Sequence, residues 1–430
     1  MMDVMDTGID WINTIPSTWS VKRLKAVLED RNESNNPEKT DFILSLTNDR
    51  GVIPYTEKGE VGNKSKDDLT AYKLAYPDDI VMNSMNVFIG SVALSKYFGC
   101  VSPVYYMLHR RNEEDSIRYY NYLFQTKELQ EKLHGYGNGI MEIRMRIQMS
   151  KLNTVMLPVP PTSVQHRIAE YLDRKCAKID AIIEKQQAVI EKLNAYKLSV
   201  ITEAVTKGLN PDVEMKDSGI EWIGKIPSDW KIVKLKYCTY IRARLGWKGL
   251  KADEYTEKGF PLLSAFNIVN NKLTFENLNF INQNRYDESP EIKLSIDDVL
   301  LVKDGAGIGK CAIVTELPYS STVNGSIAVV TSIDLLSGKF LYYYFMTNMF
   351  QKLIDRIKGG MGVPHLFQSD LKEIQIPLPT ENEQNRVVDY LEKKCSKIDA
   401  SIIKKQSVID KLQNYKKSLI YEVVTGKKEV

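Results

Sequence analysis

Cysteine and histidine are scarce in this chain of 430 residues, and neither is spaced as a metal or catalytic site requires. The five cysteines are scattered without a CxxC pair, and the four histidines form no HExxH motif. Disulfide frameworks and zinc sites both depend on clustered residues of these types. We therefore expect neither a disulfide nor a metal site. A GxSxG nucleophile motif is missing as well.

Long apolar runs are also missing from the sequence. No stretch approaches the roughly 18 residues that a membrane-spanning helix needs. The first residues, MMDVMDTGIDW, are acidic and lack the apolar core of a signal peptide. We therefore expect a cytoplasmic protein that does not contact a membrane. The net charge of only +3 neither requires nor excludes nucleic acid, because Lys and Arg can gather on one face.

What the sequence does contain is a tandem duplication. Residues 165–206 and 384–425 are identical at 24 of 42 positions without a gap, and both stretches lack Pro and Gly. Apolar residues recur at spacings of four and three, which predicts the heptad seam of a coiled coil. Each helix would be on the order of 60 Å long, so two of them in one chain can bury each other's apolar stripe. The expected seam residues are Ile168, Leu172, Ile179, Leu193 and Tyr196, and in the second copy Val387, Leu391, Ile398, Leu412 and Tyr415.

Four polar residues interrupt this pattern. A core helix within one globular domain is the alternative to a coiled coil. The interruptions are Lys175 and Gln186, with their counterparts Lys394 and Lys405. Gln186 and Lys405 either fix the register of the two helices or face a partner. The length and the strict duplication argue against the globular alternative.

The two halves of the chain also repeat in their opening segments. Residues 6–25 and 217–236 are identical at 11 of 20 positions, and each carries paired tryptophans around Ile-Pro-Ser. We expect these tryptophans to pack an extended arm onto a domain, with base stacking as the alternative. Short apolar runs and turn signals follow in each half, as is typical of mixed α+β domains. A proline-rich strap then marks the boundary before each long helix.

The predicted organisation has four parts. A first globular domain covers residues 1–157, and a central long helix covers 158–208. A second globular domain covers residues 209–376, and a C-terminal long helix covers 377–430. The interiors of the two domains differ almost completely, as a comparison of residues 48–68 with 267–290 shows. One scaffold therefore carries two different recognition surfaces.

The best candidate for an enzyme motif is the stretch DVLLVKDGAGIGK at residues 298–310. It resembles the nucleotide-binding turn of methyltransferases. The equivalent residues 79–91 keep only the last glycine, no βαβ series surrounds the motif, and no Asp/Asn-Pro-Pro-Tyr/Phe tetrapeptide occurs. The tripeptide Glu291-Ile292-Lys293, which fits part of a nuclease site, has no counterpart in the first copy. We interpret the glycines as a turn and expect no catalysis by this chain.

The repeated segments resemble a known family across nearly the full chain. DTGIDWINTIPSTW and DSGIEWIGKIPSDW look like the openings of the two halves of type I restriction-modification specificity subunits. LPVPPTSVQHRIAEYLDRKCAKIDAIIEKQ and IPLPTENEQNRVVDYLEKKCSKIDASIIKKQ look like the family's central and C-terminal conserved helices. One departure is visible, because Val164 stands where the second copy and the family have an acidic residue, Glu383. We expect only a local change in helix capping or partner contact there.

The resemblance implies an α+β fold with two mixed α/β target-recognition domains, separated by two long helices that form an antiparallel coiled coil. It implies a DNA sequence-specificity subunit that reads a bipartite double-stranded site, one domain per half-site, while the coiled coil sets the gap. Two modification (methyltransferase) subunits and further restriction (translocase/endonuclease) subunits would dock on this scaffold. No cofactor is expected in this chain, since S-adenosylmethionine, ATP and Mg²⁺ would be held by the partners.

DNA contacts are expected from basic or amide side chains near the divergent loops, reaching base edges or phosphates. In the first copy these candidates are Asn138, Arg144, Arg146 and Lys151. In the second copy they are Arg242, Arg244, Lys248, Lys303, Lys310, Asn324, Lys358 and His365. The cluster from Arg242 to Lys248 is the densest of them. For any single residue the alternative is an ordinary solvated charge.

Two other classes of function stay open on the sequence alone. One is a self-contained methyltransferase or nuclease that uses the Gly305 loop. The other is a coiled-coil scaffold that binds protein and no DNA. Methyl transfer by the purified chain would favour the enzyme. Absence of sequence-specific DNA binding, even with modification subunits present, would favour the scaffold.

Overall fold

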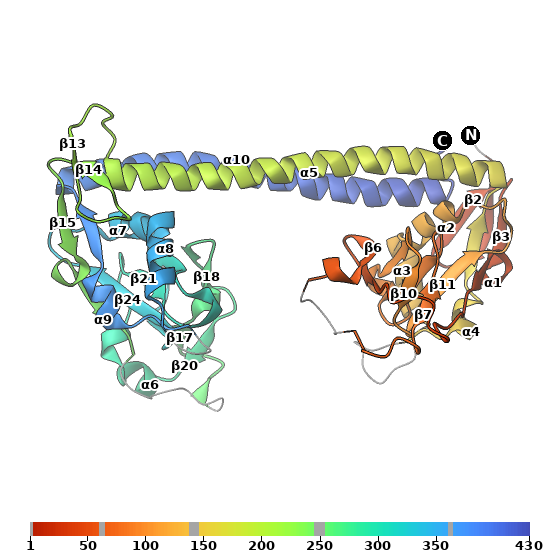
Figure 1. Cartoon of the computed structure of the whole chain (residues 1–430), viewed down its shortest axis with the longest axis horizontal. Coiled ribbons are helices and arrows are strands. Elements are labelled where there is room, and N and C mark those ends of the chain that lie inside the picture. Colours follow the sequence, from red (N-terminus) through yellow and green to blue (C-terminus); the bar gives the residue numbers. More distant parts are fainter. Residues whose placement is uncertain (1–2, 60–64, 137–145, 245–253, 360–363) are drawn as a thin grey trace. The chain divides into compact units, whose positions relative to one another are not determined.

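A computed structural model describes residues 3–59, 65–136, 146–244, 254–359 and 364–430. The chain divides into two compact units (Figure 1), which we call unit 1 and unit 2. Unit 1 comprises residues 1–187 and 406–430, and unit 2 comprises residues 188–405. Each unit therefore contains one globular domain and parts of both long helices. This division differs from the four consecutive segments of the sequence-based organisation, because the C-terminal part of the last helix belongs to unit 1.

Unit 1 contains short strands and helices followed by the first long helix. Its opening arm and first sheet strand are β1 (Val4–Ile9), β2 (Ile12–Pro16), β3 (Ser20–Arg23), α1 (Leu24–Val27) and β4 (Leu28–Asp30). Its middle strands are β5 (Leu44–Thr47), β6 (Gly51–Pro54), β7 (Lys73–Ala75), β8 (Ile80–Asn83), β9 (Val92–Leu94), β10 (Gly99–Val101) and β11 (Tyr105–Arg110), with 3₁₀ turns η1 (Tyr55–Glu57) and η2 (Val87–Ile89). It continues with α2 (Ile117–Phe124), α3 (Lys127–His134), α4 (Met149–Leu152), β12 (Met156–Val159) and the first part of the long helix α5 (Thr162–Lys207), which passes into unit 2 after residue 187.

Unit 2 repeats this order of elements. Its arm contains β13 (Met215–Asp217), β14 (Lys225–Pro227), β15 (Lys231–Lys234) and η3 (Leu235–Tyr237). Its domain contains β16 (Thr239–Arg242), β17 (Phe260–Leu263), η5 (Ala265–Asn267), β18 (Ile268–Val269), β19 (Lys272–Leu273), β20 (Asn279–Ile281), α6 (Gln283–Asp287), η6 (Pro290–Ile292), β21 (Val299–Val302), η7 (Gly305–Gly307), β22 (Cys311–Ile313), β23 (Thr322–Val323) and β24 (Ile327–Ser332). The helices that follow are α7 (Gly338–Met346), α8 (Asn348–Ile357) and α9 (Gln368–Glu373), then β25 (Gln375–Leu378) and the first part of the long helix α10 (Glu381–Val424), which passes into unit 1 after residue 405.

Both domains are built on the same four-stranded antiparallel sheet. Its strand order is β4-β11-β8-β9 in unit 1 and β16-β24-β21-β22 in unit 2. The duplicated α+β fold predicted from the sequence is therefore confirmed. The glycine-rich stretch after β21 turns directly into its antiparallel neighbour β22. A nucleotide-binding turn of the βαβ type needs a following helix and a parallel strand, so this stretch is a hairpin turn.

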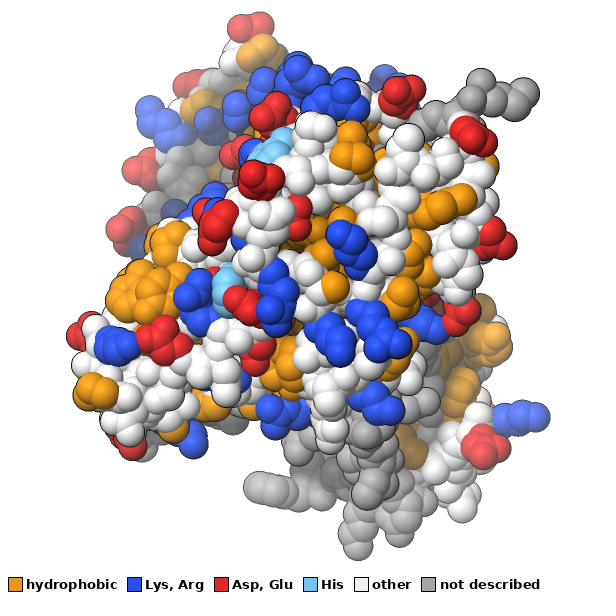
Figure 2. All heavy atoms as spheres, turned by 90° about the vertical axis from the view of Figure 1, so that its right-hand side faces the viewer, with side chains coloured by type: hydrophobic (Ala, Val, Ile, Leu, Met, Phe, Trp, Pro, Cys, Tyr) orange, Lys and Arg blue, Asp and Glu red, His pale blue; other side chains and the backbone are white. Residues whose placement is uncertain are grey.

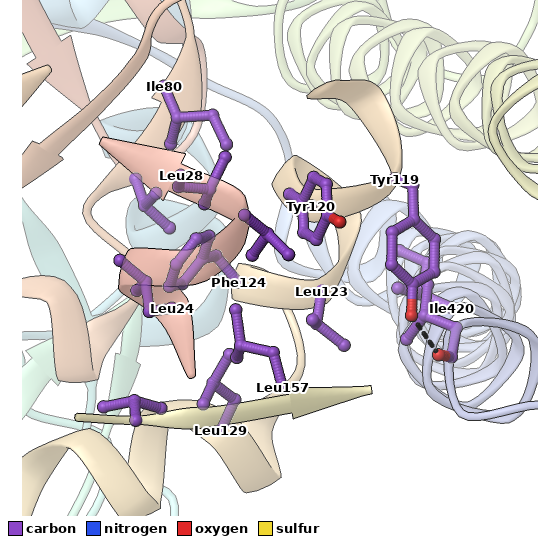
Figure 3. Packing of buried hydrophobic residues seen from close by; sticks show 14 of the residues in the cluster. Leu24, Leu28, Ile80, Tyr119, Tyr120, Leu123, Phe124, Leu129, Leu157 and Ile420 are labelled. Atoms are coloured by element: carbon purple, nitrogen blue, oxygen red, sulfur yellow. Dashed lines mark hydrogen bonds between the residues drawn. The ribbon is translucent and has the colours of Figure 1, made fainter. Parts of the chain in front are cut away.

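The core of unit 1 lies where the aromatic helix α2 packs against the sheet (Figure 3). Tyr119, Tyr120, Leu123 and Phe124 are fully buried, because aromatic and aliphatic residues recur on the inner face of this short helix. The Tyr119 hydroxyl lies 3.0 Å from the carbonyl oxygens of both Pro158 and Val424. The end of α10 is thereby attached to the domain of unit 1 by packing and by a hydrogen bond.

The opening arms pack as structural elements in both units. Trp11, Trp19 and Trp230 are buried, and Trp222 is half-buried. Burial of Trp11, Trp19 and Trp230 leaves no free ring face for stacking on bases, so these three pack the arms. The proline-rich straps are strands rather than bare linkers, since β12 pairs with β3 and β25 pairs with β15.

A buried glutamine connects each long helix to its domain. Gln165 Oε1 accepts from the Ser116 backbone N–H at 3.0 Å, and Gln384 Oε1 accepts from that of Ser337 at 2.8 Å. In unit 2 the adjacent Glu383 also accepts from the Trp230 indole N–H at 2.8 Å. Val164 holds the equivalent place in unit 1 and packs against the core. The departure from the family pattern thus exchanges one hydrogen bond for an apolar contact.

The two long helices pair in opposite directions within each unit. In unit 1, Ile168, Leu172 and Ile179 near the start of α5 are buried in one cluster with Leu419 and Val423 near the end of α10. In unit 2, the start of α10 and the end of α5 share a cluster that includes Val387, Leu391 and Val200. Ile398 is buried as well, while Leu193 and Leu412 are half-buried. An antiparallel coiled coil is the arrangement that both units contain.

Tyr196 and Tyr415 do not belong to the seam, and their assignment to it was wrong. Their side chains are 48% and 53% exposed. The neighbouring Lys197 and Lys416 take the inward position instead. Lys197 Nζ lies 2.7 Å from Asp399 Oδ1 in unit 2, and Lys416 Nζ lies 2.7 Å from Asp180 Oδ2 in unit 1.

These two ion pairs occupy equivalent positions of the repeat and set the same register in both units. Gln186 and Lys405 follow the same inward pattern and are half-buried. Lys175 and Lys394 instead lie over the rings of Tyr171 and Tyr196, 5.6 and 5.5 Å from the ring centroids. Gln186 and Lys405 therefore lie in the seam, whereas Lys175 and Lys394 lie beside it.

Candidate nucleic-acid interface

In unit 2 the end of strand β21 brings three distant segments together. The Lys303 backbone N–H donates to Ser326 O at 2.8 Å, and the Lys303 carbonyl accepts from Leu366 N–H at 2.8 Å. His365 forms an antiparallel bridge with Asp304. The candidates Lys303, Asn324 and His365 are therefore neighbours in space, although more than 60 residues separate the first from the last. We call this group, together with Lys310 on the same hairpin turn, the unit 2 patch.

The electrostatics of the unit 2 patch are dominated by Asp304. Its carboxylate pairs with His365 Nδ1 and lies 2.8 Å from Lys303 Nζ. Lys303 is largely buried, with 12% of its side chain exposed, so it holds the loops more than it offers charge. Lys310 is exposed. Asn324 Oδ1 accepts from the Ser326 N–H at 3.1 Å, which orients the amide group of Asn324 at the edge of the patch.

Arg146 occupies the corresponding place in unit 1. Ile147 N–H donates to Ser84 O at 2.9 Å, as Leu366 N–H does to Lys303 O in unit 2. Arg146 therefore stands at the position of His365, and its side chain is exposed. Lys73 lies close by, and its Nζ donates to Tyr105 O at 3.2 Å. Burial lowers the pKa of Lys73, and the Arg146 guanidinium lowers it further against the opposing Asp30 carboxylate.

Arg242, the first residue of the densest predicted cluster, serves as a structural residue of the sheet rather than as a free basic group. Its Nη2 lies 2.9 Å from Asp298 Oδ1, and the Asp298 carboxylate is completely buried. Asp298 Oδ2 also accepts from the Ser295 N–H at 2.8 Å. A buried carboxylate needs such partners, and they occupy the arginine.

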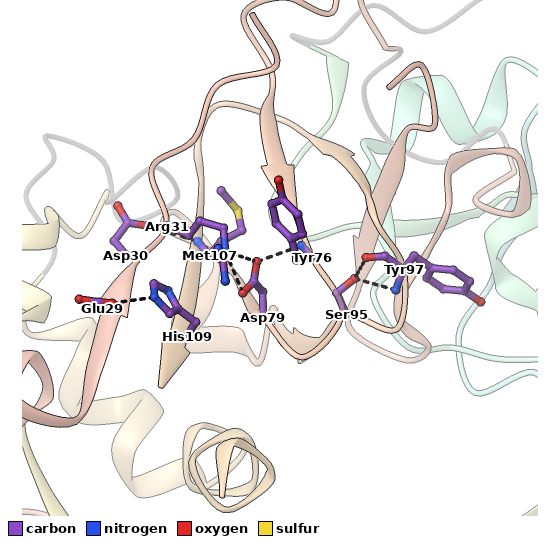
Figure 4. A network of polar contacts seen from close by, with 9 residues as sticks. All are labelled: Glu29, Asp30, Arg31, Tyr76, Asp79, Ser95, Tyr97, Met107 and His109. Carbon is purple, nitrogen blue, oxygen red and sulfur yellow. Dashed lines mark hydrogen bonds and ion pairs between the residues drawn. The ribbon is translucent and has the colours of Figure 1, made fainter. Parts of the chain in front are cut away.

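The same arrangement occurs in unit 1, where Arg31 Nε lies 3.1 Å from Asp79 Oδ2 (Figure 4). Asp79 Oδ2 accepts from the Tyr76 N–H at 2.9 Å, as Asp298 does from Ser295. Burial raises the pKa of Asp79, while the Tyr76 N–H and the Arg31 guanidinium oppose that shift. Each sheet thus carries an equivalent Arg–Asp pair, which belongs to the common frame.

The remaining candidates are dispersed. Only 6% of the Arg244 side chain is exposed, and burial lowers its pKa, with Arg285 adding to the shift. Arg244 is therefore poorly placed to reach a phosphate. Lys151 on α4 is exposed, and Lys358 lies 2.7 Å from Asp355. Asn138, Arg144 and Lys248 lie outside the described residues.

Sequence reasoning missed two residues of these surfaces, Lys73 and Phe266. Phe266 lies on η5 beside the unit 2 patch and is 92% exposed. The missed signal was the internal alignment, since Leu44-Ser45-Leu46-Thr47-Asn48 matches Leu263-Ser264-Ala265-Phe266-Asn267 and places Phe266 opposite Thr47. A phenylalanine is unusual among polar turn residues, which indicates a role outside the core.

No large surface region of one charge sign is visible on the face shown in Figure 2. Lys and Arg side chains form small groups there, with Asp and Glu side chains between them. Within the described residues no group of His, Cys, Asp or Glu could hold a metal ion. No helix of the described part is long and apolar enough to cross a membrane. The face in that view thus carries no broad field of one charge sign.

Comparisons with known proteins agree on one family. The sequence profile described as "Type I restriction modification DNA specificity domain" matches residues 16–192 and 227–410. The MjaVIII type I restriction enzyme specificity subunit of Methanocaldococcus jannaschii is 26% identical over 81% of this chain and 80% of its own length. The putative MjaX specificity subunit of the same organism is 26% identical over 97% of this chain and 95% of its own.

A solved chain shares the fold. It comes from work on complex assembly and conformational transition of the type I R-M system, and it matches with a TM-score of 0.70. The match covers 96% of this chain and 99% of that chain at 14% sequence identity. At this sequence identity the match supports a shared fold and nothing further.

The Arg–Asp pairs predict domain-specific instability. Arg242→Met leaves a buried carboxylate without its cation, which costs about 3–5 kcal/mol. We expect amide hydrogen exchange of β21 and β24 to lose protection, while the sheet of unit 1 keeps it. Arg31→Met is the matched control and should give the reverse. A stable Arg242→Met variant that loses only DNA affinity would return Arg242 to the list of DNA contacts.

Proposed function

This chain belongs to the type I restriction modification DNA specificity family, and we propose that it reads a bipartite DNA site with one recognition domain for each half-site. The observation that carries this proposal is the pairing of a common frame with different polar residues. Both sheets have the same strand order and an equivalent Arg–Asp pair. At the matching position, however, unit 1 exposes Arg146 whereas unit 2 has the half-buried His365.

The chain acts as a specificity subunit without catalysis of its own. Two observations support this. The Gly305 turn joins two antiparallel strands, and the buried carboxylate of Asp298 is paired with Arg242 within the sheet. We propose that S-adenosylmethionine, ATP and Mg²⁺ are held by modification and restriction subunits. Methyl transfer by the purified chain alone, with labelled S-adenosylmethionine, would contradict this assignment.

The gap between half-sites is proposed to depend on the number of residues in the paired helices. Repeating residues 182–188 and 408–414 once adds one heptad to each helix, removes no residue and keeps the heptad phase. We expect methylation mapping in cells that contain the partner subunits to show the same two half-sites with a longer gap. An unchanged gap would contradict the ruler idea. A wild-type system with no bipartite methylated motif would contradict the specificity function itself.

Arg146 and Lys310 should affect binding in different ways. Arg146→Gln removes a candidate base contact of unit 1, so we expect about 1–3 kcal/mol weaker binding and relaxed specificity at one half-site only. Lys310→Gln removes a candidate phosphate contact and should weaken binding to all sequences, with the salt slope reduced by roughly 0.9. Titrations of the assembled complex at several salt concentrations measure both effects.

Lys231→Gln on the arm strand β15 is the matched control for Lys310, because it removes the same exposed charge outside the patch. It should leave affinity and salt slope unchanged. If Arg146→Gln relaxed both half-sites equally, or neither, the assignment of one domain to one half-site would fail.

Two repeated apolar surfaces on the long helices are proposed docking sites for modification subunits. Val189 and Tyr196 on α5 are 37% and 48% exposed, and a spacing of seven places them on one helix face. Val408 and Tyr415 on α10 repeat them and are 36% and 53% exposed. Exposed apolar residues that recur in this way mark an interaction surface. Because both copies keep the same residue types, we propose that the same partner binds twice.

This arrangement predicts a stepwise loss of partners. Tyr196→Asp places a charge in one docking surface and should reduce the complex from two modification subunits to one. Tyr415→Asp should do the same, and the double variant should bind none. Native mass spectrometry counts the subunits directly. Loss of both subunits in one single variant would show that the two surfaces are not independent sites, and retention of both in the double variant would place docking elsewhere.

A further inference from the structure

The side chain of Phe266 has no packing partner that accounts for its position. At 92% exposure it is the most exposed large apolar side chain among the described residues. A fully exposed phenylalanine forgoes the favourable free energy of burying its ring. A position that forgoes this energy in the free protein is suited to burial against a partner.

The turn that carries Phe266 is held rigidly. The Ser264 hydroxyl accepts from the Phe266 N–H at 3.4 Å, and Asn267 Oδ1 accepts from the Ser264 N–H at 3.0 Å. Asn267 is buried, and its Nδ2 donates to the carbonyl oxygens of Thr274 and Glu276 at 3.4 and 3.3 Å. This capping box fixes the backbone on both sides of Phe266. The ring is thus presented by a preorganised turn rather than by a loose loop.

Phe266 stands beside the unit 2 patch. The Asn324 N–H donates to Leu263 O at 2.8 Å, directly before the turn. On the other side, a Cβ added to Gly307 would lie 3.8 Å from Ala265 Cβ, and Gly307 belongs to the hairpin turn that carries Lys310. A single aromatic ring next to an amide and a lysine differs from the contiguous apolar area of a protein-docking surface. It fits a nucleic acid, which offers flat apolar base faces between charged phosphates.

The aligned position in unit 1 lacks this ring. Thr47 stands there as the last residue of strand β5, and its hydroxyl accepts from the Arg50 N–H at 3.2 Å inside the β5–β6 hairpin. The aromatic ring is therefore a property of one recognition domain and not of the common frame. This asymmetry provides the matched substitution, Phe266→Thr.

We propose that Phe266 is a wedge that inserts between neighbouring base pairs of the half-site read by unit 2. The proposal rests on the DNA-reading function proposed above. Insertion of an apolar side chain unstacks one base step and bends the duplex, and the buried ring offsets part of that cost. The rigid turn sets where along the half-site the step opens. The site would then be selected partly for a step that unstacks easily, such as pyrimidine–purine.

The test uses the full chain assembled with its modification subunits and duplexes that carry 2-aminopurine at successive positions of the unit 2 half-site. Fluorescence of 2-aminopurine rises when the base is unstacked. We expect a rise at one step outside the methylated adenine with the wild-type chain. Phe266→Thr should abolish that rise and weaken binding about tenfold, which corresponds to the loss of one stacking contact. Phe266→Trp should keep the rise.

Two controls separate the wedge from other effects. The fluorescence signal at the methylated adenine, which the modification subunit moves out of the stack, should persist in Phe266→Thr. Tyr237→Ala removes another exposed ring, 70% exposed on η3, and should change neither signal. Because Phe266 is exposed, all variants should melt at the wild-type temperature.

The wedge is overturned if the wild-type complex shows no extra unstacked step, or if Phe266→Thr keeps it. Weaker binding without any change in fluorescence also overturns it, because a contact at the base edge would then be the role of Phe266. If the wild-type complex binds no DNA sequence specifically, the DNA-reading function fails before the wedge is reached. The two proposals can therefore fail separately.

Discussion

The apolar seam between α5 and α10 is the interaction on which the rest of the structure depends. A helix of 46 residues, such as α5, cannot bury its own apolar stripe. Helices in proteins gain most of their stability from packing against other elements. The chain solves this constraint by supplying the partner helix from its second half. Each domain is attached to its long helix through a buried glutamine, so helix and domain form one repeated piece of the fold. Pairing of the two helices thereby brings two recognition domains into one chain.

A division between frame and reading surface follows within each domain. The frame consists of the four-stranded sheet, the buried Arg–Asp pair and the glutamine connection. Removing one partner of a buried pair is costly, so these positions resist change. The loops at the end of β8 and β21 carry no such requirement. Exchange of His365 for Arg146 or of Phe266 for Thr47 leaves the frame intact, and this is the physical basis for two domains that share a fold and differ in contacts.

Sequence patterns predicted the duplicated fold, both long helices and the family, because periodicity and repetition are local and regular. They placed Tyr196 and Tyr415 in the seam because these residues are apolar and suit the spacing. The structure puts Lys197 and Lys416 there, and their acceptability depends on Asp399 and Asp180 of the facing helix. The structural pairing of Arg242 was missed for the same reason, since its partner Asp298 lies 56 residues away. The internal alignment marks Phe266 as a difference between the two copies, but its degree of exposure depends on the folded turn.

The charged side chains of the unit 2 patch hold the loops in place more than they attract DNA. Asp304 binds both Lys303 and His365 and so joins the hairpin after β21 to the segment before α9. A patch with its own counter-charge binds phosphate weakly, because the attraction to Lys and Arg is partly cancelled in advance. Such a surface gains little from nonspecific binding, whose strength grows with each neutralised phosphate. Discrimination then depends on oriented contacts from a few rigid side chains, and affinity depends on the additional contacts that the assembled complex supplies.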